Sequence, residues 1–105
     1  MNNNIHQGQN ILRLGADPAE ANLAVILLHG RGATAESMLP LADALSLEAA
    51  SIIIPQAGLN RWYPNSAFAP IETNEPDLSS ALELIDSIIS VTHQEGFKDD
   101  QIAIG

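Results

Sequence analysis

The sequence predicts an α/β fold in which a parallel sheet is covered by helices on both faces. Two apolar runs, residues 23–28 and 51–55, contain little or no polar alternation, which is typical of strands buried on both faces. Each run is followed by a segment with apolar residues at helical spacing, over residues 35–49 and about 76–96. Strands that alternate with helices are joined by crossovers, so we expect these strands to run parallel.

The remaining elements belong with these to one domain at most, of which residues 1–105 are expected to be a part. Residues 1–10 are polar and are expected to be flexible, while residues 11–14 predict a short edge strand closed by turn residues. Residues 101–105 predict a further strand. The predicted order is therefore an edge strand followed by βαβ, a long loop and αβ.

Each predicted helix has a start or stop signal and an expected buried face. Thr34 is a good N-cap for the first helix, and Gly96 supplies the stop of the second. The first helix is expected to bury Met38, Leu41, Ala42, Leu45 and Ala49. The second is expected to bury Leu78, Leu82, Ile85, Ile89 and Thr92, with Ala81 and Ile88 beside them.

The segment 56–74 shows neither a helical nor a strand period. It is longer than the roughly 12–15 residues that ordinary connections reach, and such loops are usually functional or disordered. It contains the only Trp and the only Tyr of the chain, Trp62 and Tyr63. Two large aromatic residues argue against simple disorder and favour a functional loop.

Composition excludes several classes of protein. With 13 acidic and 4 basic residues the net charge is −9, which argues against nucleic-acid binding. The absence of Cys excludes disulfides, thiol catalysis and Cys-ligated zinc. The longest run of large apolar residues, 23–28, is far short of the ~20 needed for a transmembrane segment. The N-terminus carries no signal-peptide pattern, so a cytoplasmic location is expected.

The turn after the first buried strand allows two functional interpretations. Residues 30–35 match G-x-G-x-x-A between a strand and a helix, the pattern that binds the pyrophosphate of a dinucleotide. The chain could then be a small doubly wound module that binds a phosphate or nucleotide at Gly30 and Gly32. However, the next strand ends in Pro55 and Gln56, without the acidic residue that would bind the ribose.

The second interpretation is an oxyanion loop. A strand followed by His-Gly-x-Gly, here His29 to Gly32, can present a backbone N–H to the oxyanion formed during acyl transfer. A purely structural explanation also exists, because a tight turn between strand and helix can require glycine for a positive φ.

Five motifs in order resemble the phospholipase/carboxylesterase family of α/β-hydrolases, which includes acyl-protein thioesterases and small bacterial carboxylesterases. The resemblance covers residues 23–105. Its motifs are Ala24-Val-Ile-Leu-Leu-His-Gly-Arg-Gly-Ala33, Met38-Leu-Pro-Leu-Ala42, Ile54-Pro-Gln-Ala57, Arg61-Trp-Tyr63 and Gln101-Ile-Ala-Ile-Gly105. It implies that the chain is the N-terminal βαβαβ portion of this fold.

The resemblance implies a role for individual residues. The backbone N–H of Arg31 corresponds to one oxyanion donor, and Trp62 to an aromatic residue near the acyl pocket. His29, Gly30 and Gly32 complete the substrate-binding loop. The expected substrate is a small acyl ester or thioester, and no cofactor is implied.

The nucleophile is expected to lie outside this sequence. In the family the last strand leads into the G-x-S-x-G nucleophile elbow, whereas this sequence ends at Gly105 and no serine lies in that motif. The resemblance thus implies that the sequence ends just before the nucleophile elbow. We expect the 105-residue chain alone, which lacks the Ser-Asp-His triad, to be inactive.

The other polar residues have simpler interpretations. His93 is expected in the last turn of the second helix and His6 in contact with solvent, and no metal site is expected. Asp99 and Asp100 are expected to form a polar turn. Arg61 could hold a substrate carboxylate or anchor its loop.

Overall fold

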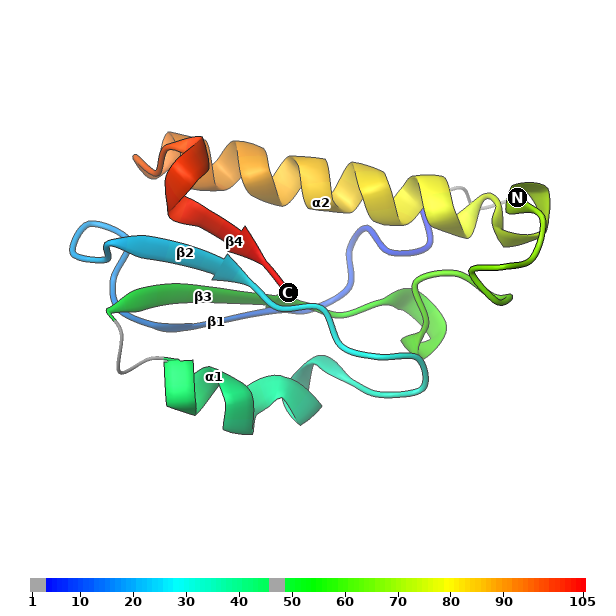
Figure 1. Cartoon of the computed structure of the whole chain (residues 1–105), viewed down its shortest axis with the longest axis horizontal. Helices are drawn as coiled ribbons and strands as arrows, with labels where there is room; N and C mark the ends of the chain where they lie inside the picture. The colour runs from blue at the N-terminus through cyan, green and yellow to red at the C-terminus, as the bar shows by residue number, and fades with distance from the viewer. Residues whose placement is uncertain (1–3, 46–48) are drawn as a thin grey trace.

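A four-stranded sheet lies between two helical layers (Figure 1). The computed structural model describes residues 4–45 and 49–105. The strands are β1 (Ile11–Gly15), β2 (Leu23–Ile26), β3 (Ala50–Pro55) and β4 (Ile102–Ile104). The main helices are α1 (Leu39–Leu45) and α2 (Asp77–Gln94), and the short 3-10 helices are η1 (Ala35–Met38), η3 (Gly58–Asn60), η4 (Ile71–Asn74) and η5 (Asp99–Gln101).

The sheet is mixed, which corrects the prediction of a purely parallel one. Its order is β1-β3-β2-β4, with β2 parallel to both β3 and β4. Strand β1 is antiparallel to β3, with Ile11 opposite Pro55. The connection from β1 to β2, residues 16–22, is too short for a crossover, which needs about a dozen residues or more. The chain therefore reverses direction between these two strands.

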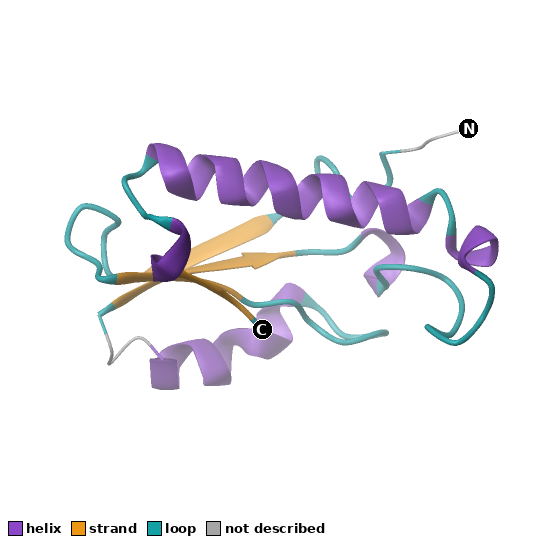
Figure 2. Cartoon of the chain, turned by 45° about the horizontal axis from the view of Figure 1, so that its top comes forward, coloured by secondary structure: helices purple, strands orange, loops and turns teal. Residues whose placement is uncertain are grey.

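The buried strands divide their side chains between two cores, as the continuous apolar runs predicted. Ile52 and Ile54 of β3 pack in the cluster on the α1 face, whereas Ile53 packs with Leu84 and Ile88 on the α2 face. The two helices lie on opposite sides of the sheet in both views (Figure 2). Burying one large aliphatic side chain contributes about 1.5–3 kcal/mol, so both faces stabilise the fold.

The first helix differs from its predicted extent. It begins with η1, whose start is capped by the Thr34 hydroxyl accepting from the Ser37 N–H, and α1 ends at Leu45. The end of the predicted helix falls partly on residues 46–48, outside the described residues, and Ala49 has a φ of 56°. Leu41, expected to be buried, is exposed because the buried face of α1 centres on Ala42.

The buried face of α2 is rotated relative to the prediction. Leu82 is 56% exposed, whereas Leu84 and Ser80 are buried. Hydrophobicity alone misplaces this face because the polar Ser80 is buried on it, where it exchanges hydrogen bonds with the half-buried Gln7. Burial of a polar group is tolerated when its hydrogen bonds are satisfied.

The connections at the carboxyl end of the sheet diverge to opposite faces. The chain leaves β2 toward η1 and α1 on one face, and it leaves the neighbouring β3 toward α2 on the other. In α/β sheets such a divergence opens a crevice beyond the strand ends, where ligands usually bind. Residues 27–34 and 56–65 therefore lie where a functional site is expected.

Candidate functional site

A cavity of about 210 Å³ lies between the two loops that follow β2 and β3. It is lined by His29, Gly30 and Arg31 from the first loop and by Trp62 and Tyr63 from the second. The structure therefore brings together four of the five site residues predicted from the sequence, and it adds Tyr63. The fifth, Gly32, is the next residue of the same loop.

His29 braces the two loops from a buried position. It is 2% exposed, and both nitrogens of its ring have partners. The Nδ1–H donates to the Gly30 carbonyl at 2.8 Å, and Nε2 accepts the N–H of Ala57 at 3.0 Å. Because the lone pair of Nε2 is occupied, this imidazole is placed to hold the loop rather than to act as a general base.

The turn itself is docked onto the second loop. The Gly32 N–H donates to the Asn60 carbonyl at 2.7 Å. The Arg31 guanidinium donates to the carbonyls of Pro64 and Asn65, each at 2.8 Å, and lies 5.5 Å from the centre of the Tyr63 ring. Among the hydrogen bonds of residues 4–45 and 49–105, none uses the backbone N–H of Arg31. That N–H is therefore available to a ligand.

The two glycines of the turn differ in whether the backbone requires glycine. Gly32 has a φ of 77°, a left-handed conformation that L side chains rarely adopt. Gly30 has no positive φ, and a Cβ placed on it would meet no atom within 4 Å. The structural explanation of a tight turn thus accounts for Gly32, whereas nothing in the described chain requires glycine at position 30.

Replacing each glycine by alanine separates these two cases. Gly32→Ala is expected to lower the free energy of unfolding by about 1–2 kcal/mol, the cost of a left-handed non-glycine residue. Gly30→Ala is expected to leave it within about 0.5 kcal/mol of the wild type, as at other sites without a special structural role. Urea unfolding of both variants measures the difference, and equal losses would refute this interpretation of the turn.

Two of the first N–H groups of the helix after the turn already have partners. That of Ala35 donates to Oε1 of Gln56 at 2.8 Å, and that of Ser37 donates to the Thr34 hydroxyl. A phosphate at a helix N-terminus needs such N–H groups to be free. The structure thus gives no support to the nucleotide-binding interpretation.

Trp62 is held by the first loop and by the N-terminal segment. Its Nε1–H donates to the His29 carbonyl at 2.9 Å. Its ring lies 5.2 Å from the ring of His29 and 5.2 Å from the ring of His6, measured between centroids. The indole is therefore held in one orientation at the wall of the cavity.

The expectation that His6 is solvated is wrong. The side chain is 1% exposed and packs beside Trp62. Little in the local sequence marks this residue, because its neighbours other than Ile5 are polar or glycine and its partners lie 52 or more positions away. Gln56, whose amide also donates to Asn60, is another residue of this region that sequence reasoning missed.

The other polar candidates lie outside the cavity wall. His93 is in the last turn of α2, as predicted, and contacts Asp99 at 2.6 Å, while Asp99 and Asp100, expected to form a polar turn, lie in η5. The Nε of Arg61 is the one buried side-chain nitrogen or oxygen in the described residues without a partner. No contact assigns Arg61 to either of the two roles considered for it.

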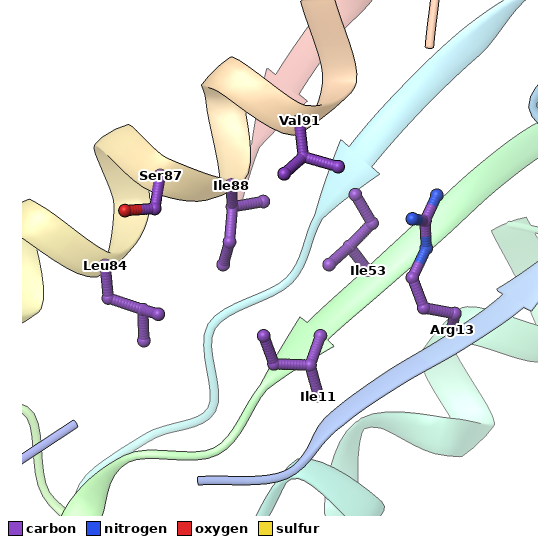
Figure 3. A pocket seen from close by; sticks show the side chains of 7 residues that line it. All are labelled: Ile11, Arg13, Ile53, Leu84, Ser87, Ile88 and Val91. Atoms are coloured by element: carbon purple, nitrogen blue, oxygen red, sulfur yellow. The ribbon is translucent and has the colours of Figure 1, made fainter. Parts of the chain in front are cut away.

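A separate cavity of about 290 Å³ lies between α2 and strands β1 and β3 (Figure 3). Its charged group, the Arg13 guanidinium, is already held by Glu95 through two hydrogen bonds of 2.9 Å. The cavity shares no lining residue with the His29 cavity and has no converging polar groups, so it does not qualify as the candidate site. It is lined by Ile11, Arg13, Ile53, Leu84, Ser87, Ile88 and Val91.

The described residues show neither a metal-binding cluster nor a membrane-spanning helix. Over residues 4–45 and 49–105, no group of three or more His, Asp or Glu side chains is arranged to hold a metal ion. In the same part of the chain, neither α2 nor any shorter helix combines the length and apolarity needed to cross a bilayer.

One solved structure relates this arrangement to a known protein. The crystal structure of a phospholipase/carboxylesterase from Dyadobacter fermentans DSM 18053 matches the chain with a TM-score of 0.87 and 37% sequence identity. The match covers 93% of this chain and 47% of that protein, so the chain spans about half the length of the relative. The sequence matches no protein-family model, and a comparison with curated proteins found no match.

The fold therefore corresponds to half of an α/β-hydrolase structure. Within that class, the chain is related to the phospholipase/carboxylesterase family, which confirms the resemblance drawn from its motifs.

Proposed function

We propose that this chain provides the oxyanion loop and part of the acyl-contacting wall of a carboxylic ester or thioester hydrolase. The observation that carries the proposal is the free backbone N–H of Arg31, beside a cavity at the carboxyl end of β2. His29 and Gly32 anchor the loop to its neighbour, so this N–H is held in place before a substrate binds. Such preorganised donors are usually a major source of rate enhancement in acyl transfer.

The charge around the cavity supports the same role. The loops 27–34 and 56–71 contain Arg31 and Arg61 and no acidic residue, although the chain carries 13 acids. Loops without acidic side chains do not repel the negative charge that develops on a bound acyl group. The acyl group is proposed to lie in the open space beside Gly30, where a Cβ would meet no atom within 4 Å.

In the proposed reaction, a serine hydroxyl attacks the acyl carbonyl and the carbonyl oxygen becomes an oxyanion. The histidine of the expected Ser-Asp-His triad takes the serine proton and passes it to the leaving group. The Arg31 N–H and the N–H of the residue after the serine stabilise the oxyanion, and the alcohol or thiol then leaves. In a second step water attacks the acyl-enzyme, and the same two N–H groups stabilise the oxyanion that forms again. Since no serine of this chain lies in a G-x-S-x-G motif, the chain is a partner in this chemistry and not sufficient for it.

A chimera tests the proposal. Residues 4–105 are joined ahead of the part of the Dyadobacter fermentans protein that this chain does not cover. We expect the chimera to hydrolyse p-nitrophenyl butyrate, while the purified 105-residue chain shows no hydrolysis above buffer. Hydrolysis by the chain alone, after controls for contaminants, would contradict the proposal. So would a chimera that folds by far-UV circular dichroism and remains inactive.

A further inference from the structure

His6 is buried in a segment, residues 4–10, that apart from Ile5 and His6 itself consists of Asn, Gln and Gly. It is 1% exposed, although the neighbouring Gln7, Gly8 and Gln9 are polar or lack a side chain. Polar groups are buried at a cost unless they are hydrogen-bonded, so the contacts of His6 explain its position.

Both ring nitrogens of His6 bind the loop that carries Trp62. Nδ1 accepts the N–H of Gly58 at 3.0 Å, and the Nε2–H donates to the carbonyl of Trp62 at 2.8 Å. Nε2 also lies 3.1 Å from the carbonyl of Asp77, the first residue of α2. One imidazole thus joins the loop after β3 to the start of the second helix.

The rest of the N-terminal segment supports this contact. Gln7 donates to the Ser80 carbonyl at 2.9 Å and accepts from the Ser80 hydroxyl at 2.6 Å. The Gln56 N–H donates to the Asn10 carbonyl at 2.9 Å. Gly58 passes so close to Ile5 that a Cβ there would lie 2.4 Å from the Ile5 carbonyl oxygen. The segment is therefore packed closely across the loop and α2.

Two consecutive amides of the loop bind two imidazoles from distant parts of the chain. The Ala57 N–H binds His29, the Gly58 N–H binds His6, and both imidazoles contact the ring of Trp62. We infer that His6 is a positioning residue that holds Trp62 against the candidate site, so that the N-terminal segment forms part of the support of its wall. The role of Trp62 in contacting an acyl group rests on the proposed function, whereas its dependence on His6 does not.

The single Trp of the chain makes this inference measurable without enzymatic activity. His6→Phe keeps an aromatic ring and removes the ring hydrogen bonds to Gly58, Trp62 and Asp77. His6→Asn places Oδ1 close to the position of Nδ1 and can still accept the Gly58 N–H. His93→Phe, at an exposed histidine on α2, is the matched control, and Ile52→Val lowers stability on the opposite face of the sheet.

We expect His6→Phe to raise the acrylamide quenching constant of Trp62 severalfold and to shift its emission to longer wavelength while far-UV circular dichroism stays native. His6→Asn is expected to recover part of the wild-type signal, and both controls to keep it. Wild-type Trp62 emission and quenching in a folded His6→Phe chain would overturn the inference. The same change in Ile52→Val at an equal folded fraction, or no recovery in His6→Asn, would also count against it.

If the His6 variants do not fold, a measurement on the wild-type chain tests the hydrogen bond between His6 and Gly58. A scalar coupling across the hydrogen bond between the Gly58 nitrogen and Nδ1 of His6 is expected in the ¹⁵N spectrum. The bond from Ala57 to Nε2 of His29, of the same N–H···N type, provides the internal reference. Absence of the Gly58 coupling when the Ala57 coupling is present would refute the role of His6. These signals are independent of hydrolase activity, so the proposed function and this inference can fail separately.

Discussion

Replacing Arg31 by proline is expected to lower the kcat of the chimera for p-nitrophenyl butyrate by about 10²–10³, the usual cost of losing one oxyanion donor. Proline has no backbone N–H, so the donor that we assign to the oxyanion is absent. The loss corresponds to about 2.7–4 kcal/mol of transition-state stabilisation. Because this bond is made mainly in the transition state, kcat and kcat/KM should fall together.

Arg31→Ala is the matched control for this experiment. It keeps the backbone N–H and removes the guanidinium, which donates to the carbonyls of Pro64 and Asn65. These contacts are exposed and are expected to contribute little to kcat. A kcat of Arg31→Ala as low as that of Arg31→Pro would show that the side chain, and not the N–H, carries the effect.

Replacing His29 by alanine is expected to lower the free energy of unfolding by about 2–4 kcal/mol. The Ala57 N–H would lose its acceptor in a buried position, which costs about 1–3 kcal/mol, and the missing ring would leave a cavity next to Trp62. Urea unfolding of the 105-residue chain, followed by far-UV circular dichroism, measures this change.

His93→Ala is the control for the His29 variant. His93 is exposed and its contact with Asp99 lies at the surface, so its loss is expected to change stability by no more than about 0.5 kcal/mol. Equal losses in the two variants would mean that His29 is not the brace of the loop. In that case the position of the Arg31 N–H would need another explanation.

The sequence predicted those parts of the molecule that depend on local patterns. The uninterrupted apolar run before His29 identified β2 as a buried central strand, and the His-Gly-x-Gly turn located the cavity at its carboxyl end. Strand direction was predicted less well. The pattern of β1 does not say which strand it pairs with, and its antiparallel pairing with β3 follows from a connection too short for a crossover.

Contacts between distant segments account for what the sequence did not reveal. His6 bonds to Gly58, Trp62 and Asp77, which are 52, 56 and 71 positions away, so no periodicity or short motif includes them. Ser80 was missed on α2 for the same reason, because its burial depends on Gln7. Buried polar groups become predictable only when their partners are known.

The assignment of the Arg31 N–H to the oxyanion can be observed directly in the ¹⁵N-labelled chimera. A p-nitrophenyl phosphonate that reacts with the catalytic serine leaves a phosphonyl oxygen in the place of the oxyanion. We expect the amide proton of Arg31 to move downfield on reaction, while that of Gly32, already bonded to the Asn60 carbonyl, stays in place. An unchanged Arg31 amide in a fully reacted chimera would contradict the oxyanion role of this loop.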